Sequence, residues 1–156
     1  MIKLLRVDHR LLHGQVAFSW TNALGTDCIL IANDSVPTDD IRKTTLKLSK
    51  PNGVKLVIKT VEDAITAINS GVTDKYKLFI IVESIHDARR LVDGCPSVRE
   101  VNLGGTKKTA EKKAVSKFIF ATEEDIDDIR AMMDTGAEVE LRQVPSDGKI
   151  KAKDVI

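Results

Sequence analysis

"KLFIIVESIHDARRLVDG", residues 77–94, shows the pattern that recurs along the whole chain. Its first part, Lys77–Val82, is a short apolar run, which is typical of a strand buried on both faces. Ser84 follows, and serine commonly caps the N-terminus of a helix. Apolar residues then recur at helical spacing until a glycine ends the run: Ile85, Ala88, Val92 and Gly94. The stretch predicts one strand followed by one capped helix.

The same alternation of strand and helix extends in both directions from this stretch. Strands are predicted at Ile2–Val7, Cys28–Ala32, Val54–Ile58, Lys77–Val82, Glu100–Leu103, Phe118–Phe120 and Glu138–Val144. Strands that alternate with helices indicate an α/β fold, so we expect a single domain with a mostly parallel, twisted sheet of about 6–7 strands and helices on both faces. Residues 138–144 alternate apolar and polar side chains, so we expect this last strand at the sheet edge, running antiparallel.

Four further helices are predicted from their apolar spacing and from the residues at their ends. They are Gln15–Leu24, a helix from near Thr38 to just before Pro51, a helix from Thr60 to Gly71, and Thr122–Thr135. In the second of these we expect Ile41, Thr45 and Leu48 to face inward.

The composition excludes several classes of protein. The chain has 156 residues, 42% of them hydrophobic and 30% charged, which suits one globular domain. A net charge of +1 argues against a nucleic-acid-binding protein, and we interpret the basic run at residues 107–113 as a solvated surface. No apolar run approaches the roughly 20 residues that span a bilayer, and the N-terminus does not resemble a signal peptide, so we expect a cytoplasmic protein.

The chain has two cysteines, Cys28 and Cys95. Two cysteines at this separation give neither a disulfide framework nor a paired metal site. We interpret both as packing residues, although Cys95, beside a glycine and a proline, is a candidate for exposure.

The loops that follow the strands are the places to search for a ligand site, because parallel sheets bind ligands beyond the carboxyl ends of their strands. The first of these loops is "DHRLLHGQ", residues 8–15. Its two histidines, His9 and His13, are open to three interpretations: a metal-binding pair, a buried structural pair, or residues that carry charge chemistry on a loop. A zinc pair on a helix is disfavoured because Gly14 interrupts any helix through this segment.

His13 is placed on the loop at the N-terminus of the next helix, where anions bind readily. A neutral imidazole nitrogen is a nucleophile near neutral pH, so this position suits the reversible attachment of a phosphoryl group. Arg10 suits the same chemistry because a guanidinium donates hydrogen bonds to phosphate in a planar fork. Asp8 is expected to orient either the histidine ring or the arginine.

The segment "RVDHRLLHGQV", residues 6–16, resembles the RIDxRLIHGQV segment of the IIB components of the mannose family of the bacterial sugar phosphotransferase system (PTS), whose members are of the mannose, fructose, sorbose and N-acetylgalactosamine types. The resemblance continues through "IANDSVPTDDIRKTTLKLSKPNGVK" (31–55) and "VREVNLGGT" (98–106) to the C-terminus. It covers essentially the whole chain, so residues 1–156 are identified as a single IIB domain of the mannose/sorbose type.

The resemblance implies a phosphocarrier and assigns its residues. His13, followed by Gly14-Gln15, matches the histidine that accepts phosphate from the IIA component and passes it to a sugar entering through the membrane components IIC and IID. The two phosphate-contacting arginines of the family fall on Arg10 and Arg42. His9 stands where relatives often carry a second aspartate, so the family assigns it no phosphate.

The resemblance also bears on cofactors and partners. It implies no metal and no organic cofactor, and association with the inner face of the membrane through IIC and IID. A homodimer is open, and neither the sugar nor the phosphorylated ring nitrogen can be told from the sequence. Gly14, Gln15, Gly104, Gly105 and Thr106 are predicted to bind the phosphate or to form the rim of the site.

Two alternative functions stay open. One is a metal-dependent hydrolase that uses His9, His13 and Asp8. The other is a nucleotide-binding regulatory module that uses the Gly104-Gly105 loop, although "NLGGTKK" fits no standard phosphate-binding motif. Asp34 and His86 are expected to be non-catalytic.

Overall fold

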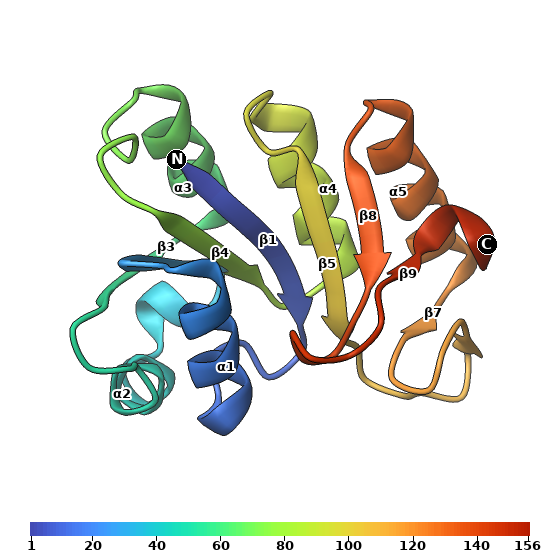
Figure 1. The fold of residues 1–156 in the computed structure, drawn as a ribbon, viewed down its shortest axis with the longest axis horizontal. Coiled ribbons are helices and arrows are strands. Elements are labelled where there is room, and N and C mark those ends of the chain that lie inside the picture. The colour runs from blue at the N-terminus through green and yellow to red at the C-terminus, as the bar shows by residue number, and fades with distance from the viewer.

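The computed structural model describes all residues from 1 to 156, and its main feature is a seven-stranded sheet with helices on both faces (Figure 1). The strand order is β3-β2-β4-β1-β5-β8-β9. In chain order these strands are β1 (Ile2–Asp8), β2 (Cys28–Ala32), β3 (Lys55–Lys59), β4 (Leu78–Val82), β5 (Glu100–Gly105), β8 (Glu138–Leu141) and β9 (Ile150–Lys151). All neighbours from β3 to β8 pair in parallel, which confirms the predicted α/β fold.

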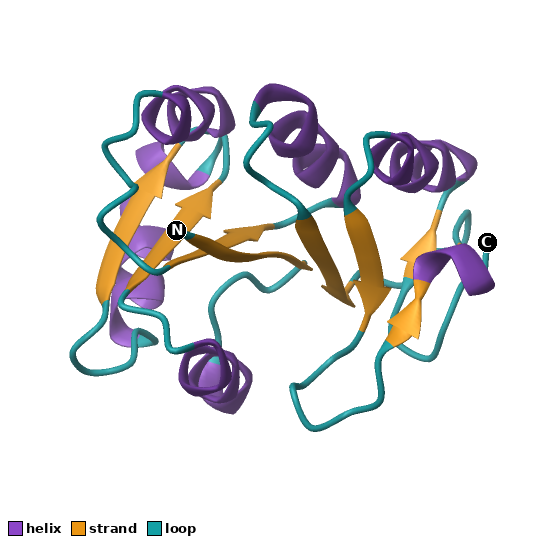
Figure 2. Cartoon of the chain, turned by 45° about the horizontal axis from the view of Figure 1, so that its top comes forward, coloured by secondary structure: helices purple, strands orange, loops and turns teal.

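Helices cover both faces of the sheet (Figure 2), and an apolar cluster lies on each face. The helices are α1 (Gly14–Leu24), α2 (Asp40–Leu48), α3 (Val61–Asn69), α4 (Ile85–Gly94) and α5 (Glu123–Asp134), with short 3-10 helices at Val36–Thr38 and Ala152–Asp154. Helices α3, α4 and α5 bury their apolar residues in the larger cluster, with Leu5 and Ile80 of the sheet. Helices α1 and α2 bury Trp20 and Leu46 in the smaller cluster.

An antiparallel strand does close the edge of the sheet, but it is β9 and not residues 138–144 as we expected. Strand β8 pairs in parallel with β5 and in antiparallel with β9. The alternation in β8 has another cause: Val139 and Leu141 pack into the larger apolar cluster, while Glu138 is exposed and Glu140, on the opposite face, is buried and pairs with Arg142 at 3.2 Å. The alternating pattern in β8 therefore separates an apolar face from a charged face, and it does not mark an edge of the sheet.

The strand predicted at residues 118–120 is also placed differently. Residues Phe120–Ala121 form β7, which pairs in antiparallel with β6 (Lys113–Ala114) in a separate two-stranded sheet. This small hairpin follows β5 and leads into α5.

The inward face predicted for the second helix is wrong. Ile41 and Leu48 are 80% and 83% exposed, and Leu46 is the buried residue of α2. A 3-10 turn precedes α2, and the helix begins at Asp40 after Asp39, whose side chain accepts a hydrogen bond from Arg42 N–H. The side that faces the protein is therefore the one that carries Arg42 and Leu46, four residues apart.

The carboxyl ends of β1, β2, β4 and β5 lie at one edge of the sheet. After β1 and β2 the chain passes to the face of α1 and α2, whereas after β4 it passes to the opposite face, where α4 lies (Figure 1). Strand β4 lies between β1 and β2, so the connections of neighbouring strands diverge on both of its sides. Such divergence leaves a crevice in which open α/β sheets bind ligands.

Candidate functional site

The loop between β1 and α1 is a strained turn with two buried anchors. Leu11 N–H donates to the Asp8 carbonyl at 2.9 Å, which closes a turn directly after the strand. Leu11 is the one non-glycine residue with positive φ, at 58°, a conformation that costs free energy for a leucine. Leu11 and Leu12 are nevertheless buried in the smaller apolar cluster. Their burial fixes the loop against the body of the protein.

His13 follows these anchors and lies at the N-cap position of α1, as the sequence predicted. Its Nε2 is 2.9 Å from Asp8 Oδ2, and its side chain is 22% exposed. The ring makes no capping hydrogen bond to α1. Since no other hydrogen bond to the ring is present, Nδ1 is the nitrogen left without a partner.

Asp8 is buried and is held by three donors. Its Oδ2 accepts from Arg6 Nη2 at 3.0 Å and contacts His13 Nε2, and its Oδ1 accepts from Arg10 N–H at 3.0 Å. Burial alone would raise the pKa of Asp8, but the bonds from His13 and from Arg10 N–H, with the charge of Arg6, lower it. Asp8 is therefore held as an ionised carboxylate in contact with the ring of His13 and with the backbone of Arg10.

Arg6 is the site residue that the sequence analysis missed. It is only 2% exposed, and its Nη1 donates to Asn102 Oδ1 at 2.7 Å and to the Arg142 carbonyl at 3.2 Å. Its Cζ lies 5.3 Å from the centre of the Trp20 ring. The signal that could have identified it is an arginine between the buried residues Leu5 and Val7 of a strand, because arginine is rarely buried without partners.

The glycines of "NLGGTKK" lie in strand β5 and not in a loop. A Cβ atom on Gly104 would overlap Cζ and Nη1 of Arg6, so this glycine lies under the guanidinium and not on the rim. Gly105 accepts a hydrogen bond from His9 N–H at 3.0 Å. Thr106 exchanges hydrogen bonds with the backbone of Phe120 and thereby fixes the hairpin. The nucleotide-binding alternative, which needs a phosphate-binding loop here, is unsupported.

Arg10 is exposed, and its guanidinium makes no hydrogen bond or ion pair within the chain. Gly14 and Gln15 are also exposed, in the first turn of α1. The first N–H groups of a helix have no partner within it, so this turn presents donors beside His13.

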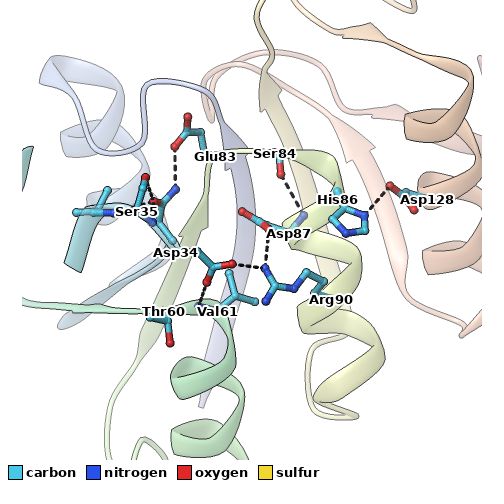
Figure 3. A network of polar contacts seen from close by, with 12 residues as sticks. Asp34, Ser35, Thr60, Val61, Glu83, Ser84, His86, Asp87, Arg90 and Asp128 are labelled. Atoms are coloured by element: carbon cyan, nitrogen blue, oxygen red, sulfur yellow. Dashed lines mark hydrogen bonds and ion pairs between the residues drawn. The ribbon is translucent and has the colours of Figure 1, made fainter. Parts of the chain in front are cut away.

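Arg42 projects toward the same edge of the sheet, but it contacts neither His13 nor Asp8. Its Nη2 is 3.2 Å from Glu83 Oε2, and its Nη1 is 3.2 Å from Ser35 Oγ. Glu83 follows β4, as Figure 3 shows. It also accepts a hydrogen bond from Asn33 Nδ2 at 2.8 Å. Arg42 is thus held on the far side of β4 from His13.

Asp34 and His86 belong to structural contacts, also visible in Figure 3. Asp34 accepts from Val61 N–H at the start of α3 and from Arg90 of α4 at 2.7 Å. The bond from Arg90, followed by that from Val61, lowers the pKa of Asp34. His86 is an exposed residue whose Nδ1 lies 3.3 Å from Asp128.

His9 lies apart from His13. It lines a cavity of about 480 Å³ with Glu83, Ser84, Thr106, Lys107 and Lys112 among its walls. Its Nδ1 is buried without a partner, next to Gly105. No group of three or more histidine, cysteine or acidic side chains is arranged to hold a metal ion, so nothing supports the metal-dependent hydrolase.

Both cysteines are buried, so Cys95 is not exposed beside its glycine and proline neighbours. Burial raises the pKa of the Cys95 thiol to about 11 and also raises the pKa of Cys28. A buried thiol with a raised pKa is a poor nucleophile.

No helix of the chain is both long enough and apolar enough to cross a membrane.

Comparisons with known proteins agree over the whole chain. The family model described as "PTS system sorbose subfamily IIB component" matches residues 2–156. A probable phosphotransferase enzyme IIB component of Streptococcus pyogenes is 38% identical over 117 residues, which are 75% of this chain and 72% of that relative. The mannose-specific EIIAB component of Escherichia coli is 33% identical over all 156 residues, and the match spans 48% of that longer relative. The crystal structure of the sorbose permease IIB domain from Klebsiella pneumoniae superimposes with a TM-score of 0.93 at 29% identity, covering 99% of this chain and 94% of that one.

Proposed function

Because the chain belongs to the sorbose subfamily of IIB components of the sugar phosphotransferase system, whose members are phosphotransferases of sugar transport, we propose that its phosphate-carrying residue is His13. His13 accepts a phosphoryl group from a phosphorylated IIA component and passes it to a sugar taken up through IIC and IID. The observation that carries the proposal is the contact between His13 Nε2 and the ionised Asp8, in a partly exposed ring at the carboxyl edge of the sheet.

The geometry favours Nδ1 of His13 as the nucleophile. With Nε2–H donating to Asp8, the lone pair of a neutral ring resides on Nδ1. In the first step this lone pair forms the new N–P bond while the donor's N–P bond breaks and its electron pair returns to the donor imidazole. In the second step a sugar hydroxyl oxygen takes the phosphoryl group, the hydroxyl proton is released, and the Nδ1–P electron pair returns to His13.

The residues around the ring provide charge for the moving phosphoryl group. Arg10 has an exposed guanidinium without an internal partner, and the first turn of α1 offers N–H donors from Gly14 and Gln15. Phosphoryl transfer depends mainly on such positioning and charge stabilisation. The proposed reaction uses no metal and no organic cofactor.

Arg42 is proposed as a second phosphate contact that requires rearrangement. It is paired with Glu83, and β4 separates it from His13. To reach the phosphoryl group, Arg42 must exchange the Glu83 carboxylate for the phosphate when the donor docks. The pair is partly exposed, so its loss costs little.

The proposed partners follow from the same relay. The name of the mannose-specific EIIAB relative joins IIA and IIB in one chain, which supports IIA as the direct donor. IIC and IID hold the sugar, so this chain works at the inner face of the membrane, in contact with proteins and not with nucleic acid. A homodimer stays open.

The test is phosphate labelling of the protein by a phosphorylated IIA component. We expect wild-type protein to acquire an acid-labile, base-stable label, as a phosphohistidine gives. His13→Ala is expected to abolish the label, and the matched control His9→Ala to retain it. A label that persists in His13→Ala, or that disappears only in His9→Ala, would overturn the assignment.

A further inference from the structure

Arg6 is buried at a position where an apolar side chain would avoid the free-energy cost of removing a charge from water. Its neighbours in β1, Leu5 and Val7, are fully buried, and removing a guanidinium from water is expensive. Burial lowers the pKa of Arg6, against the opposing effect of Asp8. Replacing a buried ion pair by apolar residues is often neutral or stabilising, so stability alone does not account for an arginine here.

Strand β5 is shaped to receive this guanidinium. Asn102, fully buried, accepts from Arg6 Nη1 at 2.7 Å and donates through Nδ2 to the Arg142 carbonyl at 3.0 Å. Gly104 leaves the space that the guanidinium fills, since a Cβ there would overlap it. The φ of Gly104 does not lie in the left-handed region, so the backbone does not require glycine at this position. Glycine is required at this position because any side chain would occupy the space of the Arg6 guanidinium.

Arg6 and His13 meet on the same oxygen atom. Asp8 Oδ2 lies 3.0 Å from Arg6 Nη2 and 2.9 Å from His13 Nε2. A continuous chain of contacts therefore runs from β5 through Arg6 and Asp8 to the ring of His13. We infer that Arg6, seated by Asn102 and Gly104, is a positioning residue that fixes His13 as the neutral Nε2–H tautomer and so leaves Nδ1 ready to accept phosphate.

The inference rests on the proposed role of His13, and it explains why a positive charge, that of Arg6, lies next to Asp8. A lone carboxylate beside an imidazole favours the protonated ring, which has no free electron pair for attack. The guanidinium of Arg6 shares the Asp8 charge and offsets that tendency. Three other charged side chains lie near Arg6 and Asp8. Arg10 comes from the loop after β1, Glu140 lies in β8, and Arg142 follows β8. Glu140 and Arg142 form an ion pair with each other at 3.2 Å.

The first test is Gly104→Ala, which displaces the Arg6 guanidinium without touching His13. Long-range ¹H–¹⁵N NMR of the imidazole should show a single Nε2–H form of His13 in wild-type protein and its loss in the variant. We expect the rate of phosphoryl transfer from phosphorylated IIA to fall ten-fold or more, and the acid limb of its pH profile to move to higher pH.

The matched control is Gly94→Ala, at the end of α4. A Cβ there meets the Ile65 side chain at 3.0 Å, so the variant strains the core far from the site. It should lower stability while leaving the His13 spectrum and the transfer rate at wild-type values. This separates loss of positioning from general destabilisation.

Arg6→Met keeps the inference testable if Gly104→Ala fails to fold. It replaces the charge by an apolar side chain of similar reach, so the protein should stay folded while the Nε2–H form of His13 and rapid transfer are lost. A folded Gly104→Ala or Arg6→Met protein with wild-type spectrum and rate would overturn the role of Arg6. Failure of wild-type protein to take up label would instead count against the proposed function.

Discussion

Leu11 shows how the loop is held in place. A left-handed leucine costs about 1–2 kcal/mol, and this residue is tolerated because its side chain is buried with Leu12. Leu11→Gly relieves the backbone but removes the anchor, whose loss costs about 2–5 kcal/mol. The two effects oppose each other, so we expect the free energy of unfolding, measured in urea, to fall by up to about 4 kcal/mol, and transfer from phosphorylated IIA to slow. A more stable variant with unchanged transfer would show that the loop needs no anchor.

Arg10 is expected to act in transfer and not in folding. Arg10→Ala removes an exposed guanidinium without an internal partner, so the unfolding midpoint should stay unchanged. The transfer rate should fall ten-fold or more, equivalent to about 1.4 kcal/mol of barrier. Arg130→Ala, an exposed arginine on α5, is the control and should transfer at the wild-type rate. Equal rates in both variants would remove Arg10 from the mechanism.

Asp34 connects three elements, β2, α3 and α4, through its bonds to Val61 N–H and Arg90. The bond from Arg90 comes first among the causes that lower its pKa, so Asp34 stabilises the folded state above its unfolded pKa, and this contribution is lost as pH falls through the lowered value. Because the carboxylate is half exposed, Asp34→Asn should cost only about 1 kcal/mol at pH 7. In urea titrations the difference between the two proteins should be full at pH 7 and should shrink as the pH falls below the unfolded pKa of about 3.9. A difference that does not shrink at all in acid would contradict the ion pair.

The helices and strands were predictable where local signals decide them. Thr122 and Asp125 form the full capping box of α5, and Ser84 caps α4, because these bonds lie within three residues of sequence. The face of α2 was not predictable, since Ile41 and Leu48 show helical spacing but are exposed. The rotation of α2 is set by the 3-10 turn before it and by the packing of Leu46, neither of which a periodicity reports.

The whole molecule brings together residues that are distant in sequence. Asp8, Arg10 and His13 were predictable as neighbours because they share one loop at the carboxyl edge of a strand. The bond between Arg6 and Asn102 spans 96 positions and depends on β1 lying beside β5, which no local pattern reveals. The sequence therefore predicts the reactive ring and its carboxylate partner Asp8, while the contacts of Arg6 and Asn102 behind that carboxylate emerge only from the topology of the sheet.

The proposed phosphoryl transfer depends on one nitrogen atom, Nδ1 of His13. Protein labelled with ¹⁵N in its imidazole rings, phosphorylated by IIA and examined by ¹⁵N–³¹P coupled NMR, identifies that atom directly. We predict a phosphoryl group bound to Nδ1 of His13, with Nε2 still protonated toward Asp8. Phosphate on Nε2 of His13, on His9, or on no imidazole at all would contradict it.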